Sequence, residues 1–587
     1  MRSETGTPTS SGLESNTVRI ATAAAILIAS LLALTASQAG GTGLRGDRVD
    51  GQADGSASPP RLVVFLVVDQ MRGDYVDRFR SDWTRGLKRL LDQGAWFSRA
   101  AYPYLSTVTC AGHATVSTGA FPRTNGIVQN AWYDRDSGRP VTCTEDSNVR
   151  AIGYGVRPEG GDSGHWLLLP TFADEMRTQR GSRVVTLSLK PRSAIMLAGR
   201  AGDAVTWLTA SLDGWQTSSA FSPAPVAAVQ QFVNSVPIAA DYGKSWMPLL
   251  EAARYHDPDA GESEEPPAGW TASFPHVLNG AGNRPDNVFL DRWQHSPFAD
   301  AYLGRFAAAL VESLQLGTRA VPDVLGIGFS SPDIVGHSFG PRSREVQDMY
   351  ARLDETIGIL LDRLDVLVGR NNYIVALTSD HGVAIIPEQG RRSGLHGGRV
   401  SSAKLRDLLD AAAQAAAGPG NYVMRVGASN EVYFHPGMYD RLRARPAALK
   451  SVIKLLDDQP GIARVFQRDQ LRDAAVSRDL LLRAAALSYV PQRSGDLVLA
   501  MEPGWTFAAL GTSHGTANTY DQQVPIVLMG PHVKPGEYRE AATPADIAPT
   551  LAALSGIAMP RAEGHVLRAA LVTPPQGQIL APPSSPR

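Results

Sequence analysis

Carboxylate and imidazole side chains gather in a few short segments of this sequence, where they could bind metal ions. Zinc accepts imidazole nitrogens and carboxylate oxygens, and two adjacent ions can clamp the attacking and leaving oxygens of a phosphoryl group. Asp333 and His337 lie four residues apart, so one turn of helix would aim both side chains at the same ion. A single pair of this kind is usually structural, and the joint occurrence of all the candidates favours a metal site. The six candidate ligands are Asp69, Asp333, His337, Asp380, His381 and His514.

Thr109 is the candidate nucleophile. It begins the stretch Thr-Cys-Ala-Gly-His-Ala-Thr-Val-Ser-Thr-Gly, which predicts the start of a helix. A helix N-terminus offers backbone N–H groups and the positive end of its dipole to a phosphate. A free threonine hydroxyl is a poor nucleophile, but zinc coordination favours its alkoxide. The alternative role for Thr109 is that of a simple helix N-cap.

The segments around these candidates have the pattern of an α/β fold. Residues 61–68, 321–329, 373–378 and 524–529 are apolar, β-branched runs, typical of strands buried on both faces. Between the second and third runs, apolar residues spaced three or four apart predict a helix over 346–364. The alternation predicts a doubly wound, mostly parallel sheet flanked by helices. Ligands bind beyond the carboxyl ends of such strands, where three of the runs are followed by Asp or Asp-His.

The length of 587 residues and the hydrophobic content of 43% exceed what one small core needs. We expect a catalytic domain over residues 61–572, with insertions near 205–319 and 400–504 that cap the site, because these two stretches break the strand–helix rhythm. The tail 573–587 is rich in Pro, Gln and Ser and is predicted to be disordered.

The N-terminal residues 1–39 have the pattern of an export signal. An Ala-, Leu- and Ile-rich run over 20–35 follows Arg19, and Ser37-Gln38-Ala39 carries small residues at the two positions that a signal peptidase reads. The run is short for a bilayer span, which needs about 20 apolar residues. Cleavage and a periplasmic or secreted location are therefore favoured, and an uncleaved membrane anchor is the alternative. Residues 40–60 are predicted to be a flexible linker.

Charge and cysteine content narrow the function classes. The formal net charge is −1, so neither a basic field for nucleic acid nor an acidic excess typical of disorder is present. Cys110 and Cys143 are the two cysteines of the chain. Export would permit a disulfide between them, but the sequence leaves their pairing open.

In combination and in order, the motifs resemble the alkaline phosphatase superfamily, and more closely its branch of threonine-nucleophile phosphatases and nucleotide pyrophosphatase/phosphodiesterases. The resemblance runs from about residue 61 to about residue 557. The segments that carry it are Val67-Val68-Asp69-Gln70, Thr107-Val108-Thr109-Cys110-Ala111-Gly112-His113, Ser331-Pro332-Asp333-Ile334-Val335-Gly336-His337, Thr378-Ser379-Asp380-His381-Gly382 and Gly511-Thr512-Ser513-His514-Gly515.

The resemblance implies two zinc ions and a covalent mechanism. Thr109 would attack phosphorus in line and form a phosphothreonine, which water then hydrolyses. The ligands implied for the ion beside the leaving oxygen are Asp333, His337 and His514. The ligands implied for the ion beside the nucleophile are Asp69, Asp380, His381 and Thr109.

Asn130, Lys190 and Arg192 resemble residues that the monoesterase members of this branch place against the phosphoryl oxygens. Lys190 and Arg192 are expected on the same side of an extended segment. A monoester carries one more charge and one more free oxygen than a diester, which suits this cationic pair. The resemblance therefore favours a phosphomonoesterase of small-molecule phosphate esters. The alternatives are a phosphodiesterase/nucleotide pyrophosphatase and a phosphonate hydrolase of the same superfamily.

Two further classes are less favoured. A sulfatase shares this fold and metal edge, but the segment from Thr109 to His113 lacks the Cys-x-Pro-x-Arg context that its nucleophile requires. A metal-stabilised extracellular binding protein without turnover is disfavoured because the nucleophile and all six candidate ligands are present.

Overall fold

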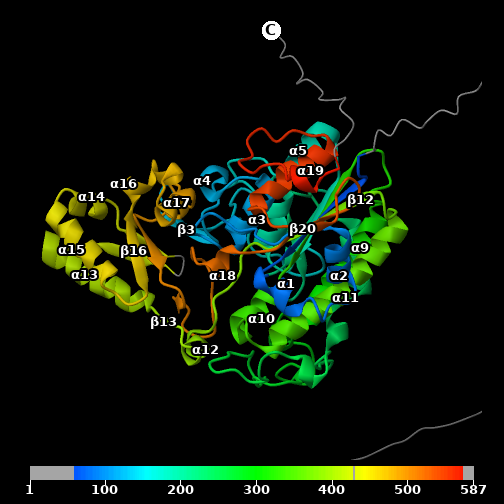
Figure 1. Cartoon of the computed structure of the whole chain (residues 1–587), viewed down its shortest axis with the longest axis horizontal. Helices are drawn as coiled ribbons and strands as arrows, with labels where there is room; N and C mark the ends of the chain where they lie inside the picture. The colour runs from blue at the N-terminus through cyan, green and yellow to red at the C-terminus, as the bar shows by residue number, and fades with distance from the viewer. Residues whose placement is uncertain (1–58, 428–429, 573–587) are drawn as a thin grey trace, which may run out of the picture. The chain divides into compact units, whose positions relative to one another are not determined.

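The computed structural model describes residues 59–427 and 430–572 (Figure 1). The predicted signal peptide at 1–39, nearly all of the predicted linker at 40–60 and the predicted disordered tail at 573–587 lie outside the described residues. Within the described part of the chain, none of the helices combines the length and the apolar character that a membrane crossing needs.

A ten-stranded sheet forms the centre of the fold, in the order β20-β2-β19-β12-β1-β11-β6-β7-β8-β5. Its five consecutive strands from β12 to β7 are mutually parallel. These five are β12 (Tyr373–Thr378), β1 (Leu62–Val68), β11 (Asp323–Phe329), β6 (Val184–Ser188) and β7 (Ala204–Leu208). The outer strands are β20 (Gly536–Tyr538), β2 (Ala95–Phe97), β19 (Ile526–Met529), β8 (Trp215–Ser218) and β5 (Ala151–Gly153).

Alternate residues of β1 pack against opposite helical layers. Leu62, Val64, Leu66 and Val68 belong to a core that includes apolar residues of α9 (Pro297–Ser313) and α11 (Arg344–Leu367). Val63, Phe65 and Val67 belong to a second core that includes residues of α3 (Thr109–Thr118), α5 (Phe172–Arg180), α6 (Pro191–Ala198) and α19 (Ile547–Ser555). Because both faces are covered, the whole strand is apolar. The predicted doubly wound α/β fold is confirmed.

The helix predicted over 346–364 is α11, which begins at Arg344 behind a Ser343 side chain that accepts a hydrogen bond from Val346 N. The predicted fourth run forms β19, which is antiparallel to β12. The reason lies in the preceding chain: His514 is hydrogen-bonded to Thr107 at the carboxyl edge of the parallel strands. A strand that starts from this edge must run in the opposite direction to its parallel neighbours.

Residues 400–504, expected as an insertion, contain a second sheet with the order β14-β15-β17-β16 (Figure 1, yellow to orange). All its strand pairs are antiparallel, and it has an apolar core of its own. The strands are β14 (Val423–Val426), β15 (Glu431–Phe434), β17 (Leu497–Met501) and β16 (Ile462–Gln467). The largest helices packed against it are α13 (Ser402–Ala417) and α15 (Pro446–Asp457).

The other expected insertion, near 205–319, contributes both of its ends to the central layers. β7 and β8 are strands of the large sheet, and α9 packs in the core beneath β11. The two strands have five and four residues, too few for a clear sequence pattern. Between β8 and α9 lie short elements, including β9 (Ser245–Trp246) and β10 (His276–Val277).

Candidate active site

The candidate ligands follow the carboxyl ends of three neighbouring strands. Asp69 comes directly after β1, and Asp380 and His381 come just after β12. Asp333 and His337 lie on α10 (Ser331–Phe339), the helix that follows β11. Since β12, β1 and β11 are adjacent and parallel, these side chains meet at one edge of the sheet.

A first group of ligand atoms surrounds one carboxylate oxygen of Asp333. Nε2 of His337, one helical turn away, lies 3.2 Å from Asp333 Oδ1, and Nε2 of His514 lies 3.7 Å from the same oxygen. The three side chains offer atoms within 4.8 Å of one another, close enough to share a metal ion. We refer to Asp333, His337 and His514 as the leaving-side group.

A second group surrounds Nε2 of His381. Asp69 Oδ1, Asp380 Oδ2 and Thr109 Oγ1 each lie 3.4 Å from this nitrogen. Asp333 also lies within 4.8 Å of Asp69 and His381, so its carboxylate stands between the two groups. We refer to Asp69, Asp380, His381 and Thr109 as the nucleophile-side group.

Backbone carbonyls set the orientation of the three imidazoles. Each ring has its Nδ1 within hydrogen-bond distance of a carbonyl oxygen, which can only accept, so Nδ1 carries the proton. Nε2 then keeps a free lone pair directed at the carboxylates, the arrangement of a metal-binding histidine. The pairs are His337 with Thr512 and His514 with Thr107, both 2.8 Å apart, and His381 with Gly382, 2.9 Å apart.

The three carboxylates place unbalanced negative charge inside the protein. Asp69 and Asp380 are fully buried, and Asp69 Oδ1 and Asp380 Oδ2 accept no hydrogen bond from the described residues. Burial, together with the charges of Asp333 and Asp380, raises the pKa of Asp69 well above its usual range. Buried, unpaired carboxylate oxygens call for a cation, and this set of carboxylate and imidazole donors fits zinc.

Lys190 supplies one positive charge to this cluster. Its Nζ lies 2.6 Å from Asp69 Oδ2 and also donates a hydrogen bond to Asp333 Oδ2. Burial lowers the pKa of Lys190, but the charges of Asp333 and Asp69 raise it overall, while the nearby charge of Arg192 acts in the opposite direction. The Nε atom of Arg192 is buried and has no hydrogen-bond partner among the described residues.

The prediction that Lys190 and Arg192 share one side of an extended segment is wrong. Lys190 has an extended backbone, but α6 begins at Pro191 and Arg192 is its second residue. Proline favours this position because its fixed φ suits the first turn and its missing N–H is not needed there. Lys190 at the N-cap and Arg192 in the first turn of α6 still lie close enough for their charges to interact.

Thr109 is the first residue of α3, and Val108 occupies the N-cap position without a side-chain hydrogen bond. Thr109 is therefore not the simple N-cap that the sequence allowed as an alternative. The side chain of Asn130 lies at the same helix start, where its Oδ1 accepts a hydrogen bond of 2.8 Å from Cys110 N. The structure thus brings Thr109 and Asn130 together at the N-terminus of α3.

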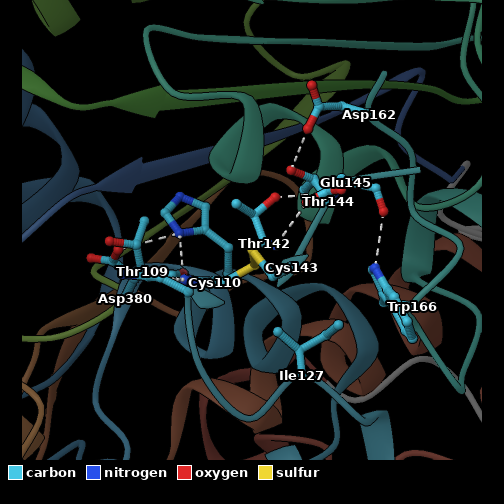
Figure 2. The surroundings of a disulfide bond; sticks show 12 residues. Thr109, Cys110, Ile127, Thr142, Cys143, Thr144, Glu145, Asp162, Trp166 and Asp380 are labelled. Carbon is cyan, nitrogen blue, oxygen red and sulfur yellow. Dashed lines mark hydrogen bonds and ion pairs between the residues drawn. A yellow bond between two sulfur atoms is a disulfide. The ribbon is translucent and has the colours of Figure 1, made fainter. Parts of the chain in front are cut away.

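Cys110 and Cys143 form a disulfide beside the candidate nucleophile (Figure 2), with their Sγ atoms 2.12 Å apart. Cys143 N also donates a hydrogen bond of 3.0 Å to the carbonyl of Asn130. The disulfide therefore ties the segment that carries Asn130 to the helix that carries Thr109. The sequence left this pairing open because export only permits a disulfide and two cysteines do not make a disulfide framework.

Gln70 is a site residue that the sequence reasoning did not single out. Its Nε2 donates to Asp333 Oδ1 at 2.7 Å, and its backbone N donates to Asp380 Oδ1 at 3.1 Å. The backbone of Gln70 is in the left-handed region, with φ of 68°, which turns the chain sharply after Asp69. Its position next to Asp69 in the Val-Val-Asp-Gln motif is the signal that could have found it.

His113 and Gly112 connect α3 to the strand ends. Nδ1 of His113 lies 2.9 Å from the carbonyl of Thr109 and 3.3 Å from Asp380 Oδ2. A Cβ at Gly112 would lie 2.2 Å from the carbonyl oxygen of Asp380, so only glycine permits this approach. The close packing fixes the distance between the start of α3 at Thr109 and the Asp380 carboxylate.

Comparisons with known proteins place the chain among phosphate-ester hydrolases. A family model described as type I phosphodiesterase / nucleotide pyrophosphatase matches residues 63–523. The chain is 32% identical over 511 residues to alkaline phosphatase PhoV of Synechococcus elongatus, covering 85% of this chain and 91% of that protein. It is 31% identical over 535 residues to alkaline phosphatase PhoK of a Sphingomonas species, covering 86% of this chain and 90% of PhoK.

A solved structure also matches over most of the fold. The crystal structure of wild-type alkaline phosphatase PafA superposes with a TM-score of 0.79 at 28% identity, covering 88% of this chain and 99% of that one. PafA of Elizabethkingia meningoseptica is 29% identical to this chain over 522 residues.

Proposed function

Because the chain belongs to the type I phosphodiesterase / nucleotide pyrophosphatase family, we propose that it is a zinc-dependent phosphomonoesterase with Thr109 as its nucleophile. Relatives that are alkaline phosphatases support hydrolysis of phosphate monoesters. The observation that carries the proposal is the convergence of Thr109 Oγ1, Asp69 Oδ1 and Asp380 Oδ2 at 3.4 Å from His381 Nε2, next to the leaving-side group.

The two groups of side chains would hold one zinc ion each. When bound, the ions supply Lewis-acid stabilisation of the charge that develops on the phosphoryl oxygens. The proposed ligands of one ion are Asp333, His337 and His514. The proposed ligands of the other are Asp69, Asp380, His381 and Thr109. The unpaired oxygens of Asp69 and Asp380 and the free Nε2 lone pairs support this assignment.

In the proposed reaction Thr109 Oγ1 attacks phosphorus, and the bond between phosphorus and the leaving oxygen breaks. The departing alcohol takes the proton, and a phosphothreonine remains on the first residue of α3. The positive dipole end of this helix favours the phosphoryl charge. Water then cleaves the phosphothreonine, which releases inorganic phosphate and restores the hydroxyl.

Selection of monoesters would come from Lys190, Arg192 and Asn130. The ammonium of Lys190 lies between the two groups, and the charge of Arg192 acts close to it. A monoester presents one more unsubstituted oxygen and one more negative charge to these donors than a diester does. A diesterase would instead need an apolar space for its second substituent at this position.

The experiment that tests the proposed function compares kcat/KM of zinc-loaded protein on phenyl phosphate and on methyl phenyl phosphate, a matched diester. We expect a clear preference for the monoester. A preference for the diester would favour the phosphodiesterase alternative, and release of phosphate from phosphonoacetate would favour the phosphonate hydrolase. No turnover of any of the three would support a binding protein without activity.

We also propose that the protein acts in the periplasm or as a secreted enzyme. The export pattern of residues 1–39 and the disulfide between Cys110 and Cys143 support this location, since disulfides persist in oxidising compartments. Mass spectrometry of the exported chain should find a new N-terminus after Ala39. An intact N-terminus in the membrane fraction would support the uncleaved anchor instead.

A further inference from the structure

A cavity of about 270 Å³ lies against the leaving-side group. His337 and His514 line one side of it, and neither Thr109 nor His381 is among its lining residues. The rings of His381 and His514 are stacked with centroids 3.5 Å apart, so His514 separates the cavity from the nucleophile-side group. In the proposed in-line displacement the leaving group departs toward the leaving-side group, and the cavity adjoins two members of that group, His337 and His514.

The rest of the cavity lining is mixed. Its polar side chains are Asn430, Thr506, Thr512, Ser513 and Thr516. Its large apolar side chains are Met501, Trp505 and Phe507, with Ala508 beside them. Met501 ends β17, and Trp505 begins β18 (Trp505–Thr506). Aromatic rings and the methionine thioether favour contact with planar aromatic groups. Small polar alcohols would leave this surface uncovered.

Trp505 is held in place by close backbone packing. A Cβ at Gly398 would lie 2.7 Å from the Trp505 ring, and a Cβ at Gly461 would lie 2.5 Å from it. β18 also pairs in parallel with β13 (Gly398–Arg399). The Trp505 ring is therefore already ordered before a ligand binds. Contact with a ligand then costs the protein little conformational entropy.

We propose that this cavity binds the leaving group of the substrate and that it favours phosphate monoesters of aromatic alcohols over those of small polar alcohols. The inference rests on the proposed function. A cavity of about 150 Å³ is enough to hold benzene, so the space here admits an aryl ring. Met501, Trp505 and Phe507 act as specificity residues that contact the ring of the leaving group.

The test measures kcat/KM on phenyl phosphate and ethyl phosphate for zinc-loaded wild type and Phe507→Ala. Each substrate is compared only with itself, so the intrinsic reactivity of its leaving group cancels. We expect phenyl phosphate to lose about tenfold, the scale of one lost aromatic contact and its buried area. Ethyl phosphate should lose clearly less. Phe298→Ala, which removes a half-buried ring that does not line the cavity, serves as the matched control.

A binding measurement separates recognition from turnover. Phenylphosphonate should inhibit Phe507→Ala about tenfold more weakly than wild type, whereas inorganic phosphate, which has no leaving group, should inhibit both equally. Trp505→Leu should give the same pattern if it folds, as judged by an unchanged thermal transition. Equal losses on both esters, or an unchanged phenylphosphonate inhibition constant, would overturn the cavity assignment. Absence of turnover in the wild type would instead overturn the proposed function.

Discussion

The proposed zinc cluster and the surroundings of His276 both bury carboxylates against imidazole, yet they are built differently. His276, on β10, has its Nε2 2.9 Å from Glu345 Oε1 on α11, and both side chains are fully buried. The imidazole stacks on Trp270 and contacts Phe274. Burial lowers the pKa of His276 to about 4 and raises that of Glu345 to about 8, so burial favours the neutral form of both groups.

At the strand ends the same residue types are arranged differently, and the Nε2 lone pairs of the imidazoles stay open. Carbonyls hold Nδ1 of three rings, so that Nε2 faces the shared carboxylates, and Lys190 adds a positive charge. The single ring of His276 contacts one carboxyl group, that of Glu345, and is enclosed by aromatic side chains. The comparison indicates that a metal site is distinguished by the number and orientation of its imidazoles. A buried carboxyl group beside a histidine is not enough.

Of the variants considered, Thr109→Ala should cause the largest loss of turnover at the proposed zinc cluster. The variant removes the attacking oxygen while the carboxylates and imidazoles remain, so kcat should fall by at least about 10³-fold with zinc retained. Thr109→Ser should keep measurable activity because it keeps a hydroxyl. Steady-state kinetics with metal analysis checks both variants, and near wild-type turnover by Thr109→Ala would rule out the covalent mechanism.

The double variant Lys190→Ala, Arg192→Ala should cause the second largest effect, a loss of monoester hydrolysis. Charge-assisted hydrogen bonds contribute roughly 1.5–3 kcal/mol each, so kcat/KM on phenyl phosphate should fall on the order of 10²–10⁴-fold. Methyl phenyl phosphate should lose much less. The measurement requires equal zinc loading of variant and wild type. Equal losses on the two esters would show that the pair acts on the fold rather than on the substrate.

The number of zinc ions bound by His514→Ala tests the difference between the proposed zinc cluster and the surroundings of His276. The variant lacks one ligand of the leaving-side group, so mass spectrometric metal analysis should find weakened binding of one of two zinc ions per chain. His276→Gln is the matched control, since its imidazole is not oriented by carbonyls toward shared carboxylates, and it should keep both ions. Loss of an ion in His276→Gln, or at most one ion in zinc-loaded wild type, would contradict the comparison.

The smallest expected effect concerns Glu264, an acidic neighbour of Glu345. Burial, together with the charges of Glu345 and Asp259, raises the pKa of Glu264 to about 8. Its pKa in the unfolded chain is about 4.3. The folded protein therefore holds a proton that the unfolded chain releases, so stability is lost as pH rises from about 4.3 to about 8.

Glu264→Gln removes this titration, because an amide does not ionise. The thermal midpoint of the variant should fall less between pH 5 and pH 9 than that of the wild type, by roughly a few degrees. Activity per bound zinc should change little, since Glu264 contacts neither group of proposed ligands. Parallel pH dependences of the two midpoints would show that Glu264 is ionised in the folded protein.

The sequence predicted the parts of the fold that depend on local pattern. β1, β11, β12 and α11 could be read from apolar runs and from helical spacing, because each is long and buried. β2 and β5 have three residues each, and their pairing is set by contacts with strands distant in sequence. Such short strands have no periodicity of their own.

Within the site, residues next to strand ends were predictable and residues placed by tertiary contacts were not. Asp69 could be named because it follows a recognisable strand. Gln70 owes its role to a left-handed backbone and to contacts with side chains about 260 residues away. The extended geometry assigned to Lys190 and Arg192 was wrong because Pro191 begins a helix between them.

The most direct test of the account is to trap the phosphorylated enzyme. Zinc-loaded protein would be mixed with phenyl phosphate, quenched in acid during turnover, digested and analysed by tandem mass spectrometry. We expect one phosphoryl group on Thr109 in the wild type and none at that position in Thr109→Ala. A phosphoryl group on a different residue, or sustained turnover with Thr109 never modified, would contradict Thr109 as the nucleophile.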